Sequence, residues 1–374
     1  MKKDIIKNII NLFSSFSVKA AGIMGNRGKN SLMCSMSKAY EDTSREFVSF
    51  RKRAKLCDDM KINCNLSGDI TDVCVILQGP LKLENNFTLE TVKFYTKMYP
   101  KCSIVVSTWD TEDAVALKEL EKNGAIVLKN KKPQKTGLGN MNFQLVSTKA
   151  GIQFAENIGA KYVLKTRTDQ RIGKYNFLEY MEGLETLFVI NNDYLNLGQK
   201  QRIIVHQGST GGNMFIPYFI SDFLYFGKTE DIKKLFSIEL DEKISMSYQE
   251  RSEWIEKLNG NVSVMEYYEK TAPEIKIIKT YIEKFSERKV NDNVKDYWEF
   301  VKNYLICVSW DDIGLFWYKY NYQNESDIFH LFEERDTDDR YLQYNWTFQN
   351  WLNLYMDRIG YKNEFEVIKE KTSY

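Results

Sequence analysis

The sequence predicts an α/β fold with a mostly parallel sheet flanked by helices, because short strand-like runs alternate with helical segments between residues 72 and 166. The runs are continuous and apolar, which is typical of strands buried on both faces. The 374 residues are 43% hydrophobic, enough for a full core and two subdomains. We expect a helical N-terminal extension over 1–70, the α/β domain over 71–230 and a mainly helical region over 231–374.

Four runs are predicted to form the strands. They are 72–77 (DVCVIL), 103–107 (SIVVS), 125–129 (AIVLK) and 161–166 (KYVLKT). Each is too short for a typical helix and ends in a turn or a charged segment.

Three segments between the strands are predicted to be helices. They are 88–98, 113–123 and 141–158. The first closes at Tyr99 and Pro100, and glycines just past the other two occupy the position where helices often end. From about residue 230 onward the pattern is helical and amphipathic, which predicts helical additions after the sheet.

The segments that follow the four strands are polar. Because parallel crossovers are right-handed, all four strands should run the same way, and these segments should share the carboxyl edge of the sheet. They are QGP (78–80), STWD (107–110), NKKPQKTGLGN (130–140) and RTDQR (167–171). Ligands of open α/β sheets bind at this edge.

RTDQR combines charges that suit a metal ion and phosphates. Asp169 is the candidate ligand for Mn²⁺ or Mg²⁺, which take oxygen ligands and often use only one or two protein carboxylates. Lys165, Arg167 and Arg171 are candidate phosphate partners, the arginines through a bidentate fork. A metal ion on a diphosphate would stabilise charge on the leaving group. The alternative is a surface ion pair with no ligand.

The other edge segments fit a nucleotide. A glycine after the first strand lets the backbone approach a base or ribose. A tryptophan after the second strand can stack on a base, although it can equally serve as core. The candidate donor contacts are Gln78, Gly79, Pro80, Thr108 and Trp109 in these segments, and Asn142 at the start of the helix that follows the third of the four segments.

A transfer reaction also needs a group that deprotonates the acceptor hydroxyl. Asp222 is the first candidate, because it follows a second short strand-like run and precedes an aromatic-glycine turn. Capping of a following helix is the structural alternative for Asp222. His206 is the other candidate base, and Asp311 and Asp312 are more remote candidates beside two tryptophans.

Composition excludes several other classes of function. The net charge of +1 gives no global bias toward nucleic acid, so we expect no nucleic-acid partner. None of the six cysteines forms a C-x-x-C pair or sits near a histidine, which argues against a zinc site. Six free thiols suit a reducing cytoplasm.

The N-terminal segment predicts an amphipathic helix and not a signal peptide. Ile5, Ile9, Leu12 and Phe16 repeat at helical spacing, and the long apolar core of a signal sequence is absent. Such a helix can dock on its own protein, the interpretation we favour, or lie on a membrane surface. We therefore expect a cytoplasmic protein, with peripheral contact at the inner membrane as the alternative.

Five stretches, VILQGP, STWD, NMNFQ, YVLKTRTDQRI and SDFLYFGK, resemble in this order the motifs of the WavE family of bacterial lipopolysaccharide and surface polysaccharide synthesis. The resemblance covers about residues 72–232, with weaker echoes in TAPEIKIIKTYIEK and GLFWYKY. It implies a GT-A-like, Rossmann-like glycosyltransferase domain with a metal-binding carboxylate motif. Thr168, Asp169 and Gln170 stand at the position of that motif with one carboxylate. Asp222 or His330 would supply a second ligand, or the arginines would replace the ion.

The resemblance implies transfer of a sugar from a nucleotide-sugar donor to a growing surface glycan of the lipopolysaccharide core or capsule. The acceptor would be a glycan or lipid-linked glycan, and the C-terminal region would complete the acceptor side. By analogy we expect a metal-assisted, inverting reaction with Asp222 as base. Thr168 is a further candidate donor contact. The alternatives are a sugar-phosphate transferase that uses a nucleotide sugar, and a non-catalytic nucleotide- or glycan-binding subunit.

Overall fold

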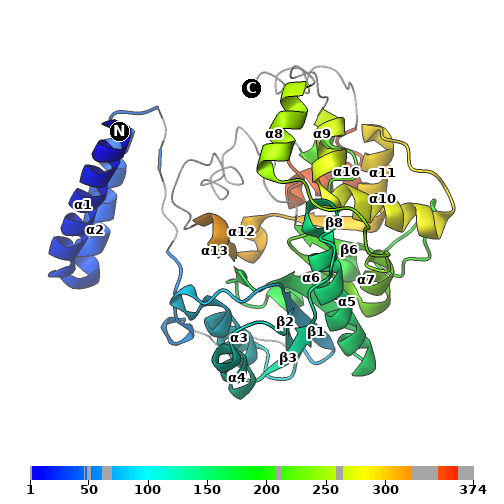
Figure 1. The fold of residues 1–374 in the computed structure, drawn as a ribbon, viewed down its shortest axis with the longest axis horizontal. Coiled ribbons are helices and arrows are strands. Elements are labelled where there is room, and N and C mark those ends of the chain that lie inside the picture. The colour runs from blue at the N-terminus through cyan, green and yellow to red at the C-terminus, as the bar shows by residue number, and fades with distance from the viewer. Residues whose placement is uncertain are drawn as a thin grey trace. The chain divides into compact units, whose positions relative to one another are not determined.

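A computed structural model describes residues 2–45, 47–48, 52–60, 70–206, 213–257, 264–321 and 344–360. The chain divides into two compact units, Met1–Ala54 and Lys55–Tyr374. The second unit contains the sheet and the helices around it (Figure 1).

Seven strands form one sheet in the order β3-β2-β1-β4-β7-β6-β8. The pairs β3–β2, β2–β1, β1–β4 and β6–β8 are parallel, whereas β7 is antiparallel to both of its neighbours. The strands are β1 Val73–Gln78, β2 Ser103–Trp109, β3 Ala125–Asn130, β4 Tyr162–Arg167, β6 Ile203–His206, β7 Tyr225–Lys228 and β8 Leu305–Val308. The predicted α/β fold with a mostly parallel sheet is therefore confirmed.

The four predicted strands are confirmed as β1 to β4, and all four run the same way. Their ends differ from the prediction by one or two residues. Thr108 and Trp109 belong to β2 and not to the loop after it, because β3 continues beside them in register with Lys129 and Asn130. Arg167 likewise belongs to β4, paired with Gln78 of β1.

The three predicted helices are confirmed as α3 Phe87–Met98, α4 Ala114–Lys122 and α5 Met141–Asn157. α5 packs closely on β1, because a Cβ atom on Gly151 would lie 2.5 Å from Cγ2 of Ile76. The other helices of this unit are α6 Phe177–Leu187, α7 Thr229–Leu235, α8 Tyr248–Lys257, α9 Val264–Thr271, α10 Pro273–Ser286, α11 Val294–Tyr304, α12 Trp310–Ile313, α13 Tyr318–Asn321 and α16 Phe348–Tyr355.

The C-terminal region, which is mainly helical as expected, also completes the sheet. β8 pairs with β6, and its residues Leu305, Ile306, Cys307 and Val308 are buried. A short second sheet pairs β5 Gln170–Ile172 with β9 Leu315–Trp317, antiparallel. This pairing matters for function, because it carries residues near 317 to the segment that follows β4.

The N-terminal unit contains two antiparallel helices, α1 Lys2–Gly22 and α2 Gly25–Glu41. Gly28 of α2 is buried, and a Cβ atom there would lie 2.1 Å from the carbonyl oxygen of Ala21. Within the described ranges, no helix of the chain combines the length and the apolar character needed to cross a membrane.

Glu185 of α6 is a carboxyl group buried in the core. Its side chain is 1% exposed, and neither oxygen has a hydrogen-bond partner within the part of the chain that the structure describes. Burial raises the pKa of Glu185 to about 9, although Lys228 acts in the opposite direction. A group whose pKa is higher in the folded state than in the unfolded state favours folding at low pH.

We expect Glu185→Gln to stabilise the protein at high pH. The contribution of Glu185 is fully present below its ordinary pKa of 4.5 and is lost as pH rises toward 9. At pH 8 the variant should gain on the order of 3 kcal/mol in unfolding free energy, and at pH 4.5 almost nothing. Denaturant unfolding at both pH values measures this, with exposed Glu121→Gln of α4 as the control. An equal difference at both pH values would contradict the account.

Candidate active site

β4 carries two cations to one face of the sheet at its carboxyl edge. Side chains alternate along a strand, so Lys165 and Arg167 point the same way. In the parallel register they lie beside Ile76 and Gln78 of β1. Ile76 faces Gly151 of α5, so both cations lie on the face of the sheet that α5 covers.

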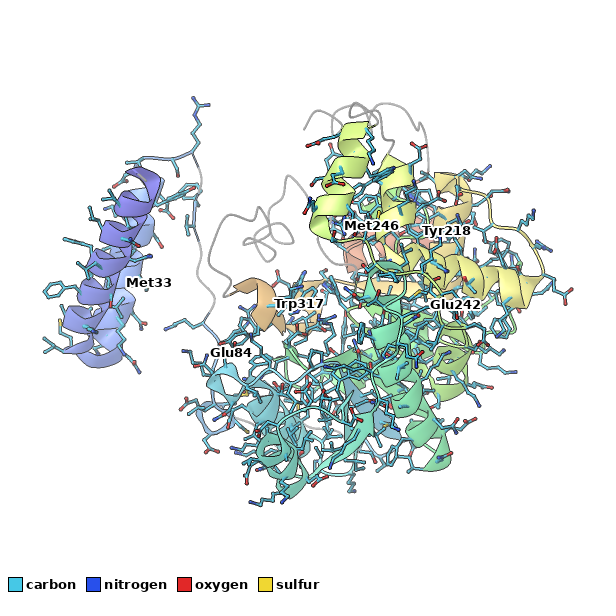
Figure 2. All side chains as sticks on the ribbon, viewed as in Figure 1. Met33, Glu84, Tyr218, Glu242, Met246 and Trp317 are labelled. Atoms are coloured by element: carbon cyan, nitrogen blue, oxygen red, sulfur yellow. The ribbon has the colours of Figure 1, made fainter. Side chains whose placement is uncertain are left out.

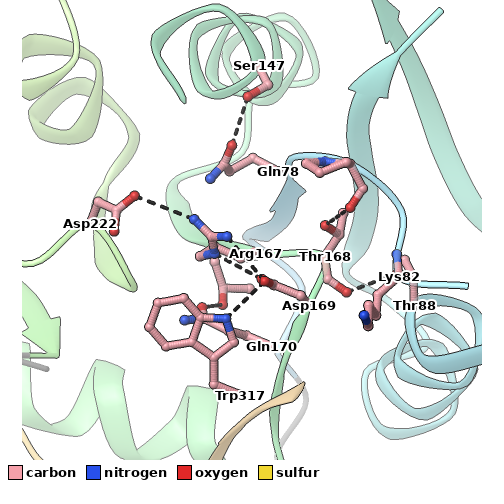
Figure 3. Close-up of polar contacts among 12 residues, drawn as sticks. Gln78, Lys82, Thr88, Ser147, Arg167, Thr168, Asp169, Gln170, Asp222 and Trp317 are labelled. Carbon is pink, nitrogen blue, oxygen red and sulfur yellow. Dashed lines mark hydrogen bonds and ion pairs between the residues drawn. The ribbon is translucent and has the colours of Figure 1, made fainter. Parts of the chain in front are cut away.

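Arg167 and Asp169 form a bidentate ion pair (Figure 3). Nε and Nη2 of Arg167 donate to the two carboxylate oxygens at 2.9 and 3.1 Å. Trp317 of β9 donates its indole N–H to the same carboxylate at 2.9 Å, and its ring lies 5.1 Å from the guanidinium carbon. The β5–β9 pairing places Trp317 opposite Gln170, next to Asp169.

These contacts keep Asp169 charged. Burial alone would raise the pKa of its carboxyl group, since the side chain is only 14% exposed. The charge and hydrogen bonds of Arg167 and the hydrogen bond from Trp317 outweigh burial and lower the pKa below its ordinary value. The pair therefore remains ionised at neutral pH.

Asp222 lies on the other side of the Arg167 guanidinium. Its carboxylate oxygen is 3.7 Å from Nη1, an ion-pair distance that is longer than a hydrogen bond, and its side chain is 13% exposed. The neighbouring Phe223 packs edge-on against Trp317, with ring centroids 4.2 Å apart. Arg167 thus stands between two carboxylates, which Figure 3 shows in one view. The sequence-based choice of Arg167, Asp169 and Asp222 is a group that the structure brings together.

Lys165 contacts this group from the interior of the protein. Its side chain is fully buried and donates to the backbone carbonyl of Asp222. The ammonium also lies near the rings of Tyr225 and Phe236, at 5.6 and 5.9 Å from their centroids. Burial lowers the pKa of Lys165 to about 8, with Asp222 acting in the opposite direction. Its contacts fix the Asp222 loop from inside the protein.

Glu274 is a group near the site that sequence reasoning missed. It lies in the first turn of α10, after Pro273. Burial raises the pKa of Glu274 well above its ordinary value, and the Asp222 carboxylate raises it further, whereas Lys165 and Arg167 lower it. The stretch TAPEIKIIKTYIEK contained the residue, but an acidic side chain in a first turn is an ordinary helix start.

Residues 78–80 join the site mainly through their backbone. The amide of Gly79 donates to Ser107, and the carbonyl of Gln78 accepts from the amide of Thr168 at 3.1 Å. The Thr168 hydroxyl donates to the carbonyl of Pro80. Gly79 has a φ of 109°, which favours glycine, so this turn needs it.

Side chains also link this turn to its neighbours. Gln78 accepts a hydrogen bond from Ser147 of α5 at 2.8 Å, and Thr88 of α3 donates to the carbonyl of Thr168 at 2.9 Å (Figure 3). These contacts fix the end of β1 against α5 and the segment after β4 against α3.

The structure does not bring Arg171 to the Arg167 group. Its guanidinium is buried and donates to the Thr91 hydroxyl and to the carbonyls of Lys55 and Phe87. Its carbon lies 4.6 Å from the Phe87 ring centroid. Arg167 is the last residue of β4, whereas Arg171 lies on β5, after the turn. The alternation of side chains along β4 therefore does not carry over to Arg171, which points toward α3. Thr91 and Phe87 belong to α3, so Arg171 fixes α3 against β5.

Asn142, Thr108 and Trp109 are also placed elsewhere. Asn142 donates to the carbonyls of Lys135 and Asp241 and accepts from the Asp241 amide, so its amide group joins two loops. Trp109 is 4% exposed and packs edge-on against Phe143. Thr108 is fully buried in β2. Their contacts are those of core residues and leave no surface for base stacking at Trp109.

The alternatives for the base also differ in position. His206 is fully buried at the end of β6, and burial lowers its pKa to about 4. Asp312 caps α12 together with Ser309. His330 lies outside the described residues.

Divalent cations need several oxygen ligands, and the residues around Asp169 do not fit one as they stand. Both oxygens of Asp169 accept hydrogen bonds from Arg167, and one also accepts from Trp317. Among the described residues, no group of three or more His, Cys, Asp or Glu side chains is close enough to hold a metal ion. The donor set is one that suits a guanidinium.

Comparison with known proteins identifies one family. A family model described as WavE lipopolysaccharide synthesis matches residues 73–371. No curated protein matches the chain.

Several solved structures are similar at low level. Mouse xyloside xylosyltransferase 1 is 10% identical, with 68% of this chain and 99% of that chain covered and a TM-score of 0.33. A cytidylyltransferase from Leptospira borgpetersenii is 14% identical over 62% and 86% of the two chains, with a TM-score of 0.27. Likeness at this level carries no conclusion about this chain.

Proposed function

The chain belongs to the WavE lipopolysaccharide synthesis family, and from this premise we propose that it transfers a sugar from a nucleotide-sugar donor to a growing bacterial surface glycan. The donor would bind at the carboxyl edge of β1 and β4, and the acceptor would be a glycan or a lipid-linked glycan. The proposed activity is that of a nucleotide-sugar-dependent glycosyltransferase with a GT-A-like sheet.

One observation carries the proposal. Arg167 stands at the end of a parallel strand, fixed by Asp169 and Trp317 on one side and facing Asp222 at 3.7 Å on the other. A fixed guanidinium at this edge is suited to a diphosphate, because its permanent positive charge attracts phosphate oxygens. A carboxylate beside it is suited to an acceptor hydroxyl.

In the proposed reaction, Asp222 takes the proton of the acceptor hydroxyl. The acceptor oxygen then forms a bond with the anomeric carbon while the bond from that carbon to the donor phosphate breaks. The electron pair leaves with the nucleotide, and Arg167 stabilises the charge that develops on its phosphate. Attack from the face opposite the leaving group inverts the anomeric centre.

Arg167 takes the place that a divalent cation holds in the sequence-based hypothesis. Asp169 orients the guanidinium and keeps it rigid, so its charge is fixed before the donor arrives. Mn²⁺ or Mg²⁺ would stabilise the same leaving group if bound, but its ligation by Asp169 would require Arg167 to move first.

Product mass tests the reaction class. Purified protein is incubated with nucleotide sugars and a rough lipopolysaccharide acceptor, and the acceptor is analysed by mass spectrometry. We expect the acceptor to gain one sugar residue, with release of the nucleoside diphosphate or, from a CMP-sugar, the monophosphate. Gain of a sugar phosphate would show a sugar-phosphate transferase. Nucleotide binding without any turnover, with every donor and acceptor tried, would show a binding subunit and contradict the proposal.

A further inference from the structure

The N-terminal hairpin of α1 and α2 packs through the side of α1 that is not its apolar side. Ser14, Ser17 and Ala21 of α1 are at most half-buried small residues, and Gly28 of α2 is the buried residue that allows a close approach. In a soluble hairpin the bulky apolar side chains of both helices would fill the contact between them. Here α2 contributes the half-buried Leu32 and Met33, whereas the described side chains of α1 contribute only small residues.

The bulky residues of α1 point away from α2 instead. They recur at helical spacing, so they form one stripe along the helix. The stripe consists of Ile5, Ile9, Leu12, Phe13 and Phe16, which are 54 to 77% exposed. Ile23 and Met24 at the turn of the hairpin are 89 and 74% exposed. Figure 2 shows the side chains that project from the hairpin. An apolar stripe of this size marks a surface that another body covers.

The net charge of the N-terminal unit indicates which kind of partner covers the apolar stripe. Residues 1–54 contain eleven Lys and Arg against four Asp and Glu, a net charge of +7. The remaining 320 residues contain forty-one against forty-seven, a net charge of −6. A second copy of residues 1–54 would bring +7 against +7, which opposes association.

The second unit offers no matching apolar surface among its described residues. Its exposed bulky side chains lie apart on different segments, such as Val115 on α4, Leu187 at the end of α6 and Ile244 after α7. Isolated exposed side chains of this kind are normal on a soluble surface. The opposite net charge of the second unit would attract the hairpin, but it would not bury the apolar side chains of the stripe.

We propose that the hairpin docks on the surface of an anionic lipid bilayer, with the stripe of α1 inserted at the boundary between headgroups and acyl chains. A helix with bulky apolar residues on one face and basic residues around it binds such a surface, because burial of the apolar face and attraction to anionic headgroups act together. The proposal does not depend on the proposed function. For the proposed enzyme, the docked hairpin would keep the protein at the surface where a lipid-linked acceptor lies.

Vesicle sedimentation of the full chain tests the proposal. We expect sedimentation with vesicles of phosphatidylcholine and phosphatidylglycerol, little with phosphatidylcholine alone, and weaker binding at high salt. The double variant Phe13→Ser/Phe16→Ser should lower the partition coefficient at least about tenfold. Arg27→Gln/Lys29→Gln, at two exposed positions of α2, should lower binding to anionic vesicles only.

A matched control and two further measurements distinguish a membrane from the other partners that could cover the stripe. Leu187→Ser/Ile244→Ser replaces side chains of similar exposure, 72 and 74%, in the second unit and should bind vesicles as the wild type does. Light scattering and thermal unfolding of the wild type and the Phe13/Phe16 variant follow. Failure to sediment with anionic vesicles overturns the proposal. A dimer that the variant dissociates would then assign the stripe to a second copy, and a lower unfolding temperature of the variant would assign it to the second unit.

Discussion

Asp222→Asn is expected to lower turnover by about a hundredfold to ten-thousandfold, which is the range that a general base contributes. The substitution keeps the shape of the side chain but removes the basic oxygen that would accept the acceptor proton. Affinity for the donor should change little, because Arg167 and Asp169 remain paired. Initial rates of nucleotide release in the presence of acceptor measure the effect on turnover, and titration with the donor measures affinity.

Two variants serve as comparisons for Asp222. Asp110→Asn, at an exposed position just after β2, should leave turnover unchanged. Glu274→Gln tests the nearby group whose raised pKa also suits a base at neutral pH. If Asp222→Asn retains most of the turnover while Glu274→Gln abolishes it, the base is Glu274 and the assignment of Asp222 is wrong.

Arg167→Gln is expected to weaken both the fold and donor binding. It leaves Asp169 and Asp222, at 14 and 13% side-chain exposure, without the guanidinium between them. Removal of one partner from a mostly buried ion pair costs about 2–4 kcal/mol in unfolding free energy. Donor affinity should fall at least about tenfold, since a charge-assisted phosphate contact is worth about 1.5–3 kcal/mol. Denaturant unfolding and donor titration measure the two effects separately.

The Arg167 effects have their own controls. Arg167→Gln/Asp169→Asn should recover part of the stability, because one uncompensated carboxylate is removed, but should recover no donor affinity. Arg171→Gln should also lose stability, because its hydrogen bonds to Thr91 and Phe87 hold α3. The donor affinity of the folded variant should equal that of the wild type. Equal donor affinity in the wild type and Arg167→Gln would place the phosphates elsewhere.

The first half of the sheet could be predicted because its signals are local. Runs such as DVCVIL and SIVVS are short, apolar and separated by helical segments, and each such run became a parallel strand. β8 was not predicted, because LICV lies in a region of helical periodicity and becomes a strand only through pairing with β6. The ends of β2 and β4 were missed because a neighbouring strand extends them beyond their apolar cores.

The candidate site shows the same difference between local sequence signals and tertiary pairing. Arg167 and Asp169 could be selected because they lie together at the end of one strand. Trp317, 148 residues after Asp169, reaches that carboxylate only through the β5–β9 pairing, which no local pattern reveals. Arg171 has the same chemistry as Arg167 and lies in the same short segment, yet the turn after β4 sends it to α3. Residue type and spacing therefore predict which groups are available, and tertiary pairing decides which of them meet.

The central claim is that a nucleotide-sugar donor binds at Arg167. The measurement that tests it most directly is a thermal-shift screen of UDP-, GDP-, CMP- and dTDP-sugars on the wild type, Asp169→Ala and Arg167→Gln, with Mn²⁺, Mg²⁺ or EDTA. We predict that one class of nucleotide sugar raises the unfolding temperature of the wild type, that EDTA leaves the shift in place, and that Arg167→Gln abolishes it. A shift that needs the metal and Asp169 but not Arg167 would restore the metal-ligand hypothesis. No shift with any nucleotide sugar would contradict the account.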